Sequence, residues 1–339
     1  MLGGDHLGPS AWQKEPAELA MTKSRELVKQ FVESGFSKIH LDTSMPCCDD
    51  PLPLPEQLIA ERSADLCAVA EKTQGKKPPL YIVGTEVPTP GGALEELNEL
   101  KITEPGDVAK TIEYTRKAFQ ALGLEQAWDR VIGVVVQPGV EFGSETIVEY
   151  DRKKAKKLSQ TIENYDGLVF EAHSTDYQSR TALRELVEDH FCILKVGPAL
   201  TFALRESIFA LAAIEEELAL IKDNLVPSRI LEVLERTMIR QPDHWRQHYS
   251  EKTTQQAFER KFSLSDRIRY YWDYPEVRTA LQSLMDNLNR LELPLPLLSQ
   301  YLPAEYKAVR SGRLLAKPTD LIHNRIRSVL KDYSFACGF

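Results

Sequence analysis

Short apolar runs alternate with longer amphipathic stretches over the first two-thirds of the chain. The short runs, rich in β-branched and apolar residues, are Met1–Gly4, Ser37–Asp42, Leu80–Gly84, Val131–Gln137, Gly167–Glu171 and Cys192–Val196. The stretches between them, which repeat apolar residues every three to four positions, include Pro16–Glu33, Pro55–Lys72, Pro105–Ala121 and Arg152–Asn164. This pattern predicts strands for the runs and helices for the stretches. Strands that alternate with helices predict βα units around a parallel sheet.

Polar residues gather at the ends of the predicted strands. They are Asp5, His6, Asp42, Glu86, Gln137, Glu171, His173 and Lys195. In a β/α barrel the carboxyl ends of the strands carry the active site, and an open doubly wound sheet also binds ligands there. The sequence has neither a G-x-G-x-x-G turn nor a G-x-x-x-x-G-K-[ST] loop, which disfavours a dinucleotide-binding sheet and a P-loop phosphotransferase. We therefore predict an α/β fold of the TIM-type (β/α)8 class.

The pattern becomes mostly helical from Ala199 onward. Ala199–Ile221 and Val226–Arg240 are predicted helices, and a helical extension follows. Its aromatic and proline-rich segments, Tyr270–Trp272 and Leu293–Tyr301, either anchor a partner or fill the core of the extension. We expect residues 1–200 to form a partial β/α barrel of six strand–helix units. Residues 201–339 then supply barrel-closing helices and the helical C-terminal extension of the same body.

The number of predicted strands is too small for a closed barrel. A (β/α)8 barrel has eight strands, and the pattern yields six. Either the strand count is low or the first two β/α units are missing upstream of Met1. In the second case we expect exposed apolar strand edges and poor solubility without a partner.

Composition narrows the classes of partner. The 339 residues include 42 Lys and Arg against 50 Asp and Glu, a net charge of -8, which argues against a nucleic-acid partner. No run approaches 18 consecutive apolar residues and no signal peptide is evident, so we expect no membrane association. The five scattered cysteines are typical of free thiols in the reducing cytoplasm.

Two neighbouring acid–histidine pairs are candidates for chemistry. Asp5 and His6 could supply a general acid or base and a metal ligand, or could be polar loop residues. His40 and Asp42 lie two apart on one strand and therefore point to the same side. Asp42 is closer to the strand end and should face the mouth. We expect the deeper His40 to be a buried histidine with its hydrogen bonds satisfied.

The densest group of polar side chains spans Glu171 to Asp176. His173 could bind a metal together with His6, and Glu171 or Glu86 could complete the set. Two histidines nevertheless fall short of the three protein ligands usual for catalytic zinc.

The last predicted strand leads into a helix at Lys195–Thr201. Lys195 could form a Schiff base or act only through its charge. Gly197, Thr201 and the free N–H groups of the helix N-terminus are candidates for binding a phosphate.

Several of these strings together resemble one family. The strings GGDHLGP, KIHLDTSM, VGTEVPTPGG, VVQPGVEF, FEAHSTDYQS, LKVGPALTFALRE and PLPLLSQYLP are similar to the non-catalytic Z subunit of class II D-tagatose-1,6-bisphosphate aldolase. The resemblance extends to about Tyr333. It implies a barrel related to class II aldolases and a partner, the catalytic subunit. The chain would be required for full activity and stability of that subunit in bacterial galactitol, tagatose 6-phosphate and N-acetylgalactosamine catabolism.

The catalytic subunits of this resemblance hold one zinc with three histidines. Asp5–His6 resembles their Asp–His pair, whereas their His–Gly step corresponds to Gln137–Gly139, which lacks an imidazole. Their third histidine falls on either Glu171 or His173, and a substrate-binding Asn is replaced by Gly197. The resemblance therefore implies a relic pocket, with zinc bound only if that pocket is still occupied.

Three functions follow from these observations. The first is an accessory subunit without independent activity. The second is a metal-dependent tagatose-bisphosphate lyase that uses Asp5, His6, Glu86 and His173. The third is a tagatose 6-phosphate kinase, because some relatives carry that label, although the sequence has no P-loop.

Overall fold

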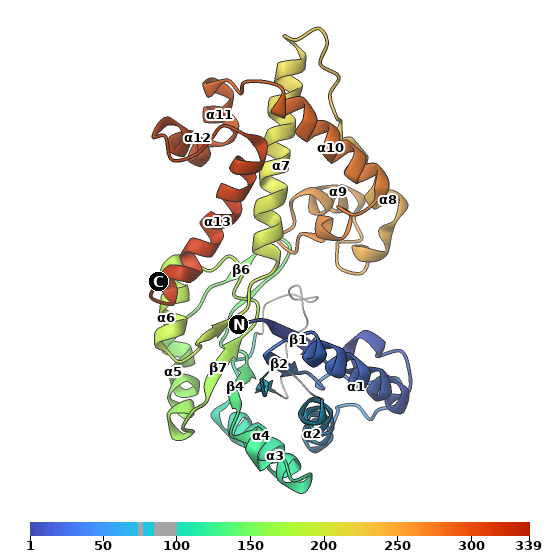
Figure 1. Ribbon diagram of the computed structural model, residues 1–339, viewed down its shortest axis with the longest axis vertical. Coiled ribbons are helices and arrows are strands. Elements are labelled where there is room, and N and C mark those ends of the chain that lie inside the picture. The colour runs from blue at the N-terminus through green and yellow to red at the C-terminus, as the bar shows by residue number, and fades with distance from the viewer. Residues whose placement is uncertain (74–76, 85–99) are drawn as a thin grey trace.

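A curled parallel sheet forms a half-barrel in the N-terminal part of the chain (Figure 1). The computed structural model describes residues 1–73, 77–84 and 100–339. The strand order is β1–β2–β3–β4–β7–β8. The strands are β1 (Gly3–Leu7), β2 (Lys38–Leu41), β3 (Leu80–Val83), β4 (Val131–Val136), β7 (Val169–Ala172) and β8 (Ile193–Leu194). The six predicted strands are thus confirmed, each shifted or shortened by a few residues.

Helices cover the outer face of the half-barrel (Figure 1). They are α1 (Ala17–Glu33), α2 (Glu56–Lys72), α3 (Pro105–Ala121), α4 (Glu125–Trp128), α5 (Arg152–Thr161) and α6 (Arg180–Glu188). Short 3₁₀ turns occur at Pro9–Trp12 and Ile162–Asn164. The predicted helices are confirmed, and the prolines lie at or just before the first turn, where a missing N–H costs nothing. The short α4 and α6 were not predicted from the sequence.

A two-stranded antiparallel hairpin follows β4. It pairs β5 (Glu141–Phe142) with β6 (Ile147–Val148). The sequence did not predict this hairpin, because strands of two residues are too short to show a periodic pattern.

The rest of the chain is helical and extends away from the half-barrel (Figure 1). Its helices are α7 (Pro198–Ala219), α8 (Ile230–Arg240), α9 (Thr253–Phe262), α10 (Pro275–Asn289), α11 (Leu295–Tyr301), α12 (Pro303–Arg310) and α13 (Pro318–Ala336), with 3₁₀ turns at Pro242–His244 and Arg267–Tyr270. Helix α7 leaves the sheet directly after β8, and α13 returns beside α7 to reach α6. Both predicted helices are present, although α8 begins at Ile230 rather than Val226.

Two large apolar clusters stabilise these two parts of the chain. One packs the strands against their helices around Tyr81, Phe119 and Phe170. The other lies among the C-terminal helices and includes the fully buried Tyr271 and Leu298. Both residues lie in segments that could have anchored a partner, so for them the core interpretation is confirmed. Among the residues that the structure describes, no helix is both long enough and apolar enough to cross a membrane.

Strand β1 is irregular where it carries polar side chains. Its register shifts between Gly4 and Leu7, and His6 has a positive φ of 54°. Gly8 lies so close to the end of β2 that a Cβ atom there would come within 1.6 Å of the Asp42 carbonyl oxygen. Asp5 and His6 therefore belong to the strand itself, and the prediction that they follow it was wrong by three residues.

Candidate functional site

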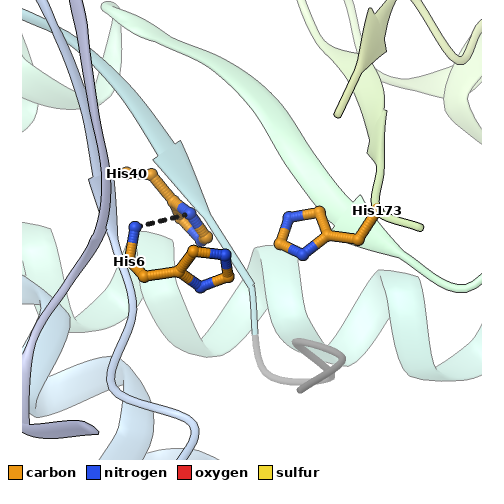
Figure 2. Close-up of side chains that lie close together, drawn as sticks. All are labelled: His6, His40 and His173. Carbon is orange, nitrogen blue, oxygen red and sulfur yellow. Dashed lines mark hydrogen bonds between the residues drawn. The ribbon is translucent and has the colours of Figure 1, made fainter. Parts of the chain in front are cut away.

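Three imidazole rings meet on the concave side of the half-barrel (Figure 2). They belong to His6 on β1, His40 on β2 and His173 just after β7. The ring centroids are 5.0 Å apart for His6 and His173, 5.1 Å for His6 and His40, and 5.6 Å for His40 and His173. One nitrogen from each ring lies within 4.8 Å of the other two. Strands from both halves of the sheet thus contribute to one cluster.

Asp42 fixes the orientation of His6. The His6 Nδ1 atom lies 2.7 Å from Asp42 Oδ2, and the Ser44 hydroxyl donates to Asp42 Oδ1 over 2.8 Å. Burial alone would raise the pKa of Asp42, but the hydrogen bond from His6 lowers it to about 2. The ionised carboxylate accepts the Nδ1 proton, so the His6 Nε2 lone pair is left free. Asp42 is buried and does not line the cavity described below, contrary to the prediction that it faces the mouth.

Glu171 has the same effect on His173. The His173 Nε2 atom lies 2.9 Å from Glu171 Oε1, and the Glu171 side chain is completely buried. Burial opposes ionisation of Glu171, but the hydrogen bond from His173 and nearby positive charges hold its pKa below the usual value. The ionised carboxylate accepts the Nε2 proton, so the His173 Nδ1 lone pair is free.

His40 is the most deeply buried of the three imidazoles. Its Nδ1 lies 3.3 Å from the His6 backbone N–H and 3.1 Å from Lys195 Nζ, and both groups donate to it. Its Nε2 is buried and has no hydrogen-bond partner among residues 1–73, 77–84 and 100–339. Burial lowers the pKa of His40 well below its usual value, so the ring is neutral. The predicted burial is confirmed, but the expectation that its hydrogen bonds are satisfied was wrong.

Two lysines join carboxylates from opposite ends of the sheet. Lys195, just after β8, lies 3.0 Å from Glu171 Oε1 and 3.4 Å from Asp5 Oδ1. Lys38 of β2 lies 2.7 Å from Asp5 Oδ1 and 3.4 Å from Glu171 Oε2. Because β1 and β8 are the two edge strands, the Lys195–Asp5 contact links the sheet edges across the concave side.

A cavity of about 330 Å³ opens beside the imidazoles. Its walls come from the strand ends, the hairpin, the start of α7 and one residue of the C-terminal helical part. The lining residues are Asp5, His6, Phe142, His173, Ser174, Asp176, Lys195, Val196, Gly197, Pro198, Thr201 and Arg269. Six of the predicted site residues therefore line one cavity: Asp5, His6, His173, Lys195, Gly197 and Thr201. Glu171 is buried and does not line it.

The predicted phosphate site at α7 is already used within the protein. The backbone N–H groups of Gly197 and Ala199 donate to Asp176 Oδ1 over 2.9 Å and 2.8 Å. The Thr201 hydroxyl donates to the Pro198 carbonyl over 3.2 Å. Burial raises the pKa of Asp176 despite these hydrogen bonds. The expectation of free N–H groups at this helix N-terminus was therefore wrong, because the carboxylate of Asp176, in the loop after β7, occupies those of Gly197 and Ala199.

Some site residues were not found from the sequence, and one lies outside the described residues. Glu86 falls within residues 85–99, outside the described ranges. Lys38 was missed, although Lys38, His40 and Asp42 alternate along β2 and so point to one side. Arg269 was missed because it comes from a distant turn, and no local pattern connects it to the strand ends.

The donor set of the three imidazoles fits a divalent metal of intermediate softness. Zinc and its neighbours favour neutral imidazole nitrogens, and a ligating histidine usually donates its other N–H to a carboxylate. His6 and His173 are held in this way by Asp42 and Glu171. His40 offers a third imidazole, but its unpartnered Nε2 carries the ring proton while Nδ1 accepts from His6 and Lys195, so metal binding there requires a change of tautomer.

The parallel half-barrel, with polar side chains at the carboxyl ends of its strands, defines an α/β protein whose sheet is consistent with a TIM-like fold. A sequence model of the GatZ_KbaZ-like family, described as D-tagatose-1,6-bisphosphate aldolase subunit GatZ/KbaZ-like, matches residues 1–338. The chain belongs to this family, and the resemblance inferred from its motifs is confirmed.

Two solved structures resemble the chain to very different degrees. A "probable tagatose 6 phosphate kinase from Sinorhizobium meliloti 1021" is 43% identical, with a TM-score of 0.90, over 99% of this chain and 82% of that chain. The fructuronate-tagaturonate epimerase UxaE from Cohnella laeviribosi is 11% identical, with a TM-score of 0.40, over 96% of this chain and 67% of that chain. The second likeness is too weak to carry an argument.

Proposed function

We propose that the chain is the accessory, non-catalytic subunit of a D-tagatose-1,6-bisphosphate aldolase. Its partner is the catalytic class II subunit, whose activity and stability it raises in the breakdown of tagatose 6-phosphate, galactitol and N-acetylgalactosamine. Membership of a family of aldolase subunits over residues 1–338 supports this role.

One observation supports the accessory role most strongly. The groups that could bind a substrate phosphate, the N–H groups at the start of α7 and the Lys195 ammonium, are already bound by carboxylates of the chain itself. Asp176 accepts the N–H groups of Gly197 and Ala199 at the start of α7. The Lys195 ammonium is held by Glu171 and Asp5. A phosphate would have to displace a carboxylate from the helix, at the cost of leaving a buried charge without its partners. Such a pocket favours a subunit that acts through contact with another subunit.

Reconstitution tests this role. The chain and the catalytic subunit are purified separately, mixed and isolated as a complex, and cleavage of D-tagatose 1,6-bisphosphate is then measured. We expect no cleavage by the chain alone and a higher rate for the complex than for the catalytic subunit alone. Failure of the two chains to associate would contradict the proposal.

The proposal extends to the class of barrel and to the cellular compartment. We infer that the curled sheet is an arc of a (β/α)8 barrel related to class II aldolases, and that residues 201–339 belong to the same body. We place the protein in the cytoplasm, because all five cysteines are free.

A kinase is the second candidate, favoured by the name of the 43% identical structure. It predicts ATP binding by calorimetry and phosphate transfer to tagatose 6-phosphate. A metal-dependent lyase is the third, favoured by the imidazole cluster. It predicts metal-dependent cleavage of the bisphosphate by the chain alone, with loss of cleavage in His6→Ala.

A further inference from the structure

We propose that His6, His40 and His173 bind one divalent metal ion of the zinc class on the concave side of the half-barrel. This inference goes beyond the accessory role and does not depend on it. These ligands differ from those of the catalytic class II subunits, whose three zinc-binding histidines lie in an Asp–His pair, in a His–Gly step and in a third strand-end stretch. The stretch Gln137–Gly139 has no imidazole, and His40 supplies one from a different strand.

Two of the ligands are already oriented for metal binding. His6 directs Nδ1 at Asp42 Oδ2 over 2.7 Å, which leaves Nε2 to the cluster. His173 directs Nε2 at Glu171 Oε1 over 2.9 Å, which leaves Nδ1 to the cluster. Both carboxylates are buried, so each ring is held in one orientation and one tautomer.

The third ligand requires a change of tautomer. The His40 Nδ1 accepts from the His6 backbone N–H and from the Lys195 ammonium, so the ring proton lies on Nε2, a buried donor with no hydrogen-bond partner among the described residues. Coordination through Nε2 moves this proton to Nδ1 and breaks both hydrogen bonds, while Lys195 keeps its ion pairs with Glu171 and Asp5. Removal of an unpaired buried N–H offsets part of that cost.

A bound ion would join strands that are distant in the sheet. β1 and β2 are neighbours at one edge, whereas β7 lies next to the strand at the other edge. Lys195 and Asp5 already link the two edges through charge, and the ion would add a link between the same two halves. When bound, such an ion also supplies a Lewis acid facing the cavity that His6 and His173 line.

A titration of the full chain tests the proposal. The protein is stripped with a chelator, and binding of Zn²⁺ is measured by calorimetry, with Co²⁺ absorbance as a second probe of coordination. We expect one equivalent to bind and the melting temperature to rise with the added metal. The intensity of the visible absorbance of bound Co²⁺ then reports whether the ion has the low coordination number typical of zinc sites.

Variants assign the ion to these residues. We expect His40→Gln and His173→Gln each to weaken Zn²⁺ binding at least 100-fold, and Asp42→Asn, which keeps all three imidazoles, to weaken it about 10-fold. His190→Gln is the matched control, because the His190 side chain is solvent-accessible and, among the residues that the structure describes, its ring pairs with Glu163 alone. Circular dichroism establishes that each variant is folded. If a histidine variant does not fold, the Zn²⁺ affinity of Asp42→Asn, compared with that of the control, tests the site.

Two results would overturn the metal site. One is the absence of stoichiometric binding of Zn²⁺ or Co²⁺ to the stripped protein. The other is a Zn²⁺ affinity that is the same in His40→Gln, His173→Gln and Asp42→Asn as in the control His190→Gln. Because no catalytic subunit is present in these measurements, they are independent of the reconstitution result.

Discussion

Gly8 shows how a single residue sets the position of the site. Its backbone packs against the carbonyl of Asp42, and a Cβ atom would come within 1.6 Å of that oxygen. The same residue follows His6 by two positions and Asp42 orients the His6 ring, so the spacing at Gly8 determines where the imidazole lies.

Replacement of Gly8 by alanine should therefore separate β1 from the end of β2. We expect Gly8→Ala to lower the free energy of unfolding by about 3 kcal/mol, because a backbone clash cannot be relieved by a rotamer change. Gly197→Ala is the control, since no atom lies within 4 Å of its Cβ position, and it should change stability by less than about 0.5 kcal/mol. Urea denaturation measures both, and equal stabilities would show that the strand spacing is not constrained by Gly8.

Glu171 gives a second test at the residue scale. Its buried carboxylate contacts Lys38, Lys195 and His173. In Glu171→Gln the two lysine ammonium groups lose this carboxylate and keep only Asp5 as an acidic partner among the described residues. We expect a loss of about 3 kcal/mol in the free energy of unfolding, measured in the presence of a chelator. The exposed pair of Glu163 and His190 supplies the control Glu163→Gln. A Glu171 variant as stable as this control would argue against the ionic network.

Much of the site could be predicted residue by residue, because strand ends are visible in the sequence. Asp5, His6, His173 and Lys195 were named in this way and line one cavity. The involvement of His40 was not predicted, because the sequence cannot show which nitrogen of a buried ring lacks a partner. The internal use of the α7 N-terminus by Asp176 was also not predictable, since it depends on a loop conformation.

At the scale of elements, α13 connects the C-terminal helices to the strand-end loop of the site. The Tyr333 hydroxyl donates to the Thr175 carbonyl over 2.8 Å and lies 3.2 Å from the Thr175 hydroxyl. Thr175 in turn donates to the Lys195 carbonyl over 2.6 Å. The last helix thus holds the two loops that carry His173 and Lys195.

Removal of the Tyr333 hydroxyl should loosen this connection. We expect Tyr333→Phe to lower the free energy of unfolding by about 1 kcal/mol and to speed amide exchange at Thr175. Tyr165→Phe is the control, because Tyr165 packs against the same apolar cluster and its hydroxyl has no hydrogen bond among the described residues. Unchanged exchange at Thr175 would mean that the loop does not depend on α13.

A second link between elements should depend on pH. Glu71 on α2 accepts hydrogen bonds from Arg130, at 2.9 Å and 2.5 Å, and from the Tyr81 hydroxyl of β3. Burial would raise the pKa of Glu71, but the hydrogen bonds from Arg130 and Tyr81 lower it below its ordinary value of 4.5. A lowered folded-state pKa gives stability that is present above pH 4.5 and lost as the pH falls through the folded-state pKa.

The difference between wild type and Glu71→Gln measures this contribution. We expect wild type to be more stable by about 2 kcal/mol at pH 7, with the difference shrinking toward pH 3. Glu113→Gln is the control, because Glu113 and Lys117 form an exposed pair whose loss should have little effect at either pH. A constant difference between pH 7 and pH 3 would contradict the assignment.

The order of strands and helices could be predicted well because their hydrophobic periods differ. The hairpin β5–β6 and the short helices α4 and α6 were missed, since each is too short to establish a period. Tertiary contacts fix these elements. The hairpin, for example, is held by Leu264, whose N–H donates to the Ser144 carbonyl over 2.8 Å.

At the scale of the whole molecule, two apolar cores are joined through α7 and α13. The helical part is large, and its exposed apolar residues include Leu220, Ile221 and Val226 near the end of α7. The sequence predicted that this part is helical. It could not show that α13 returns to the half-barrel, because that contact depends on packing between residues far apart in the chain.

The central claim is that the chain supports a catalytic aldolase subunit. The most direct test is the thermal half-life of aldolase activity of that subunit, measured with increasing amounts of the chain. We predict a half-life that lengthens until the two chains are present in a fixed ratio, while serum albumin at the same concentration has no effect. A half-life that does not change on addition of the chain would contradict the account, as would cleavage of the bisphosphate by the chain alone.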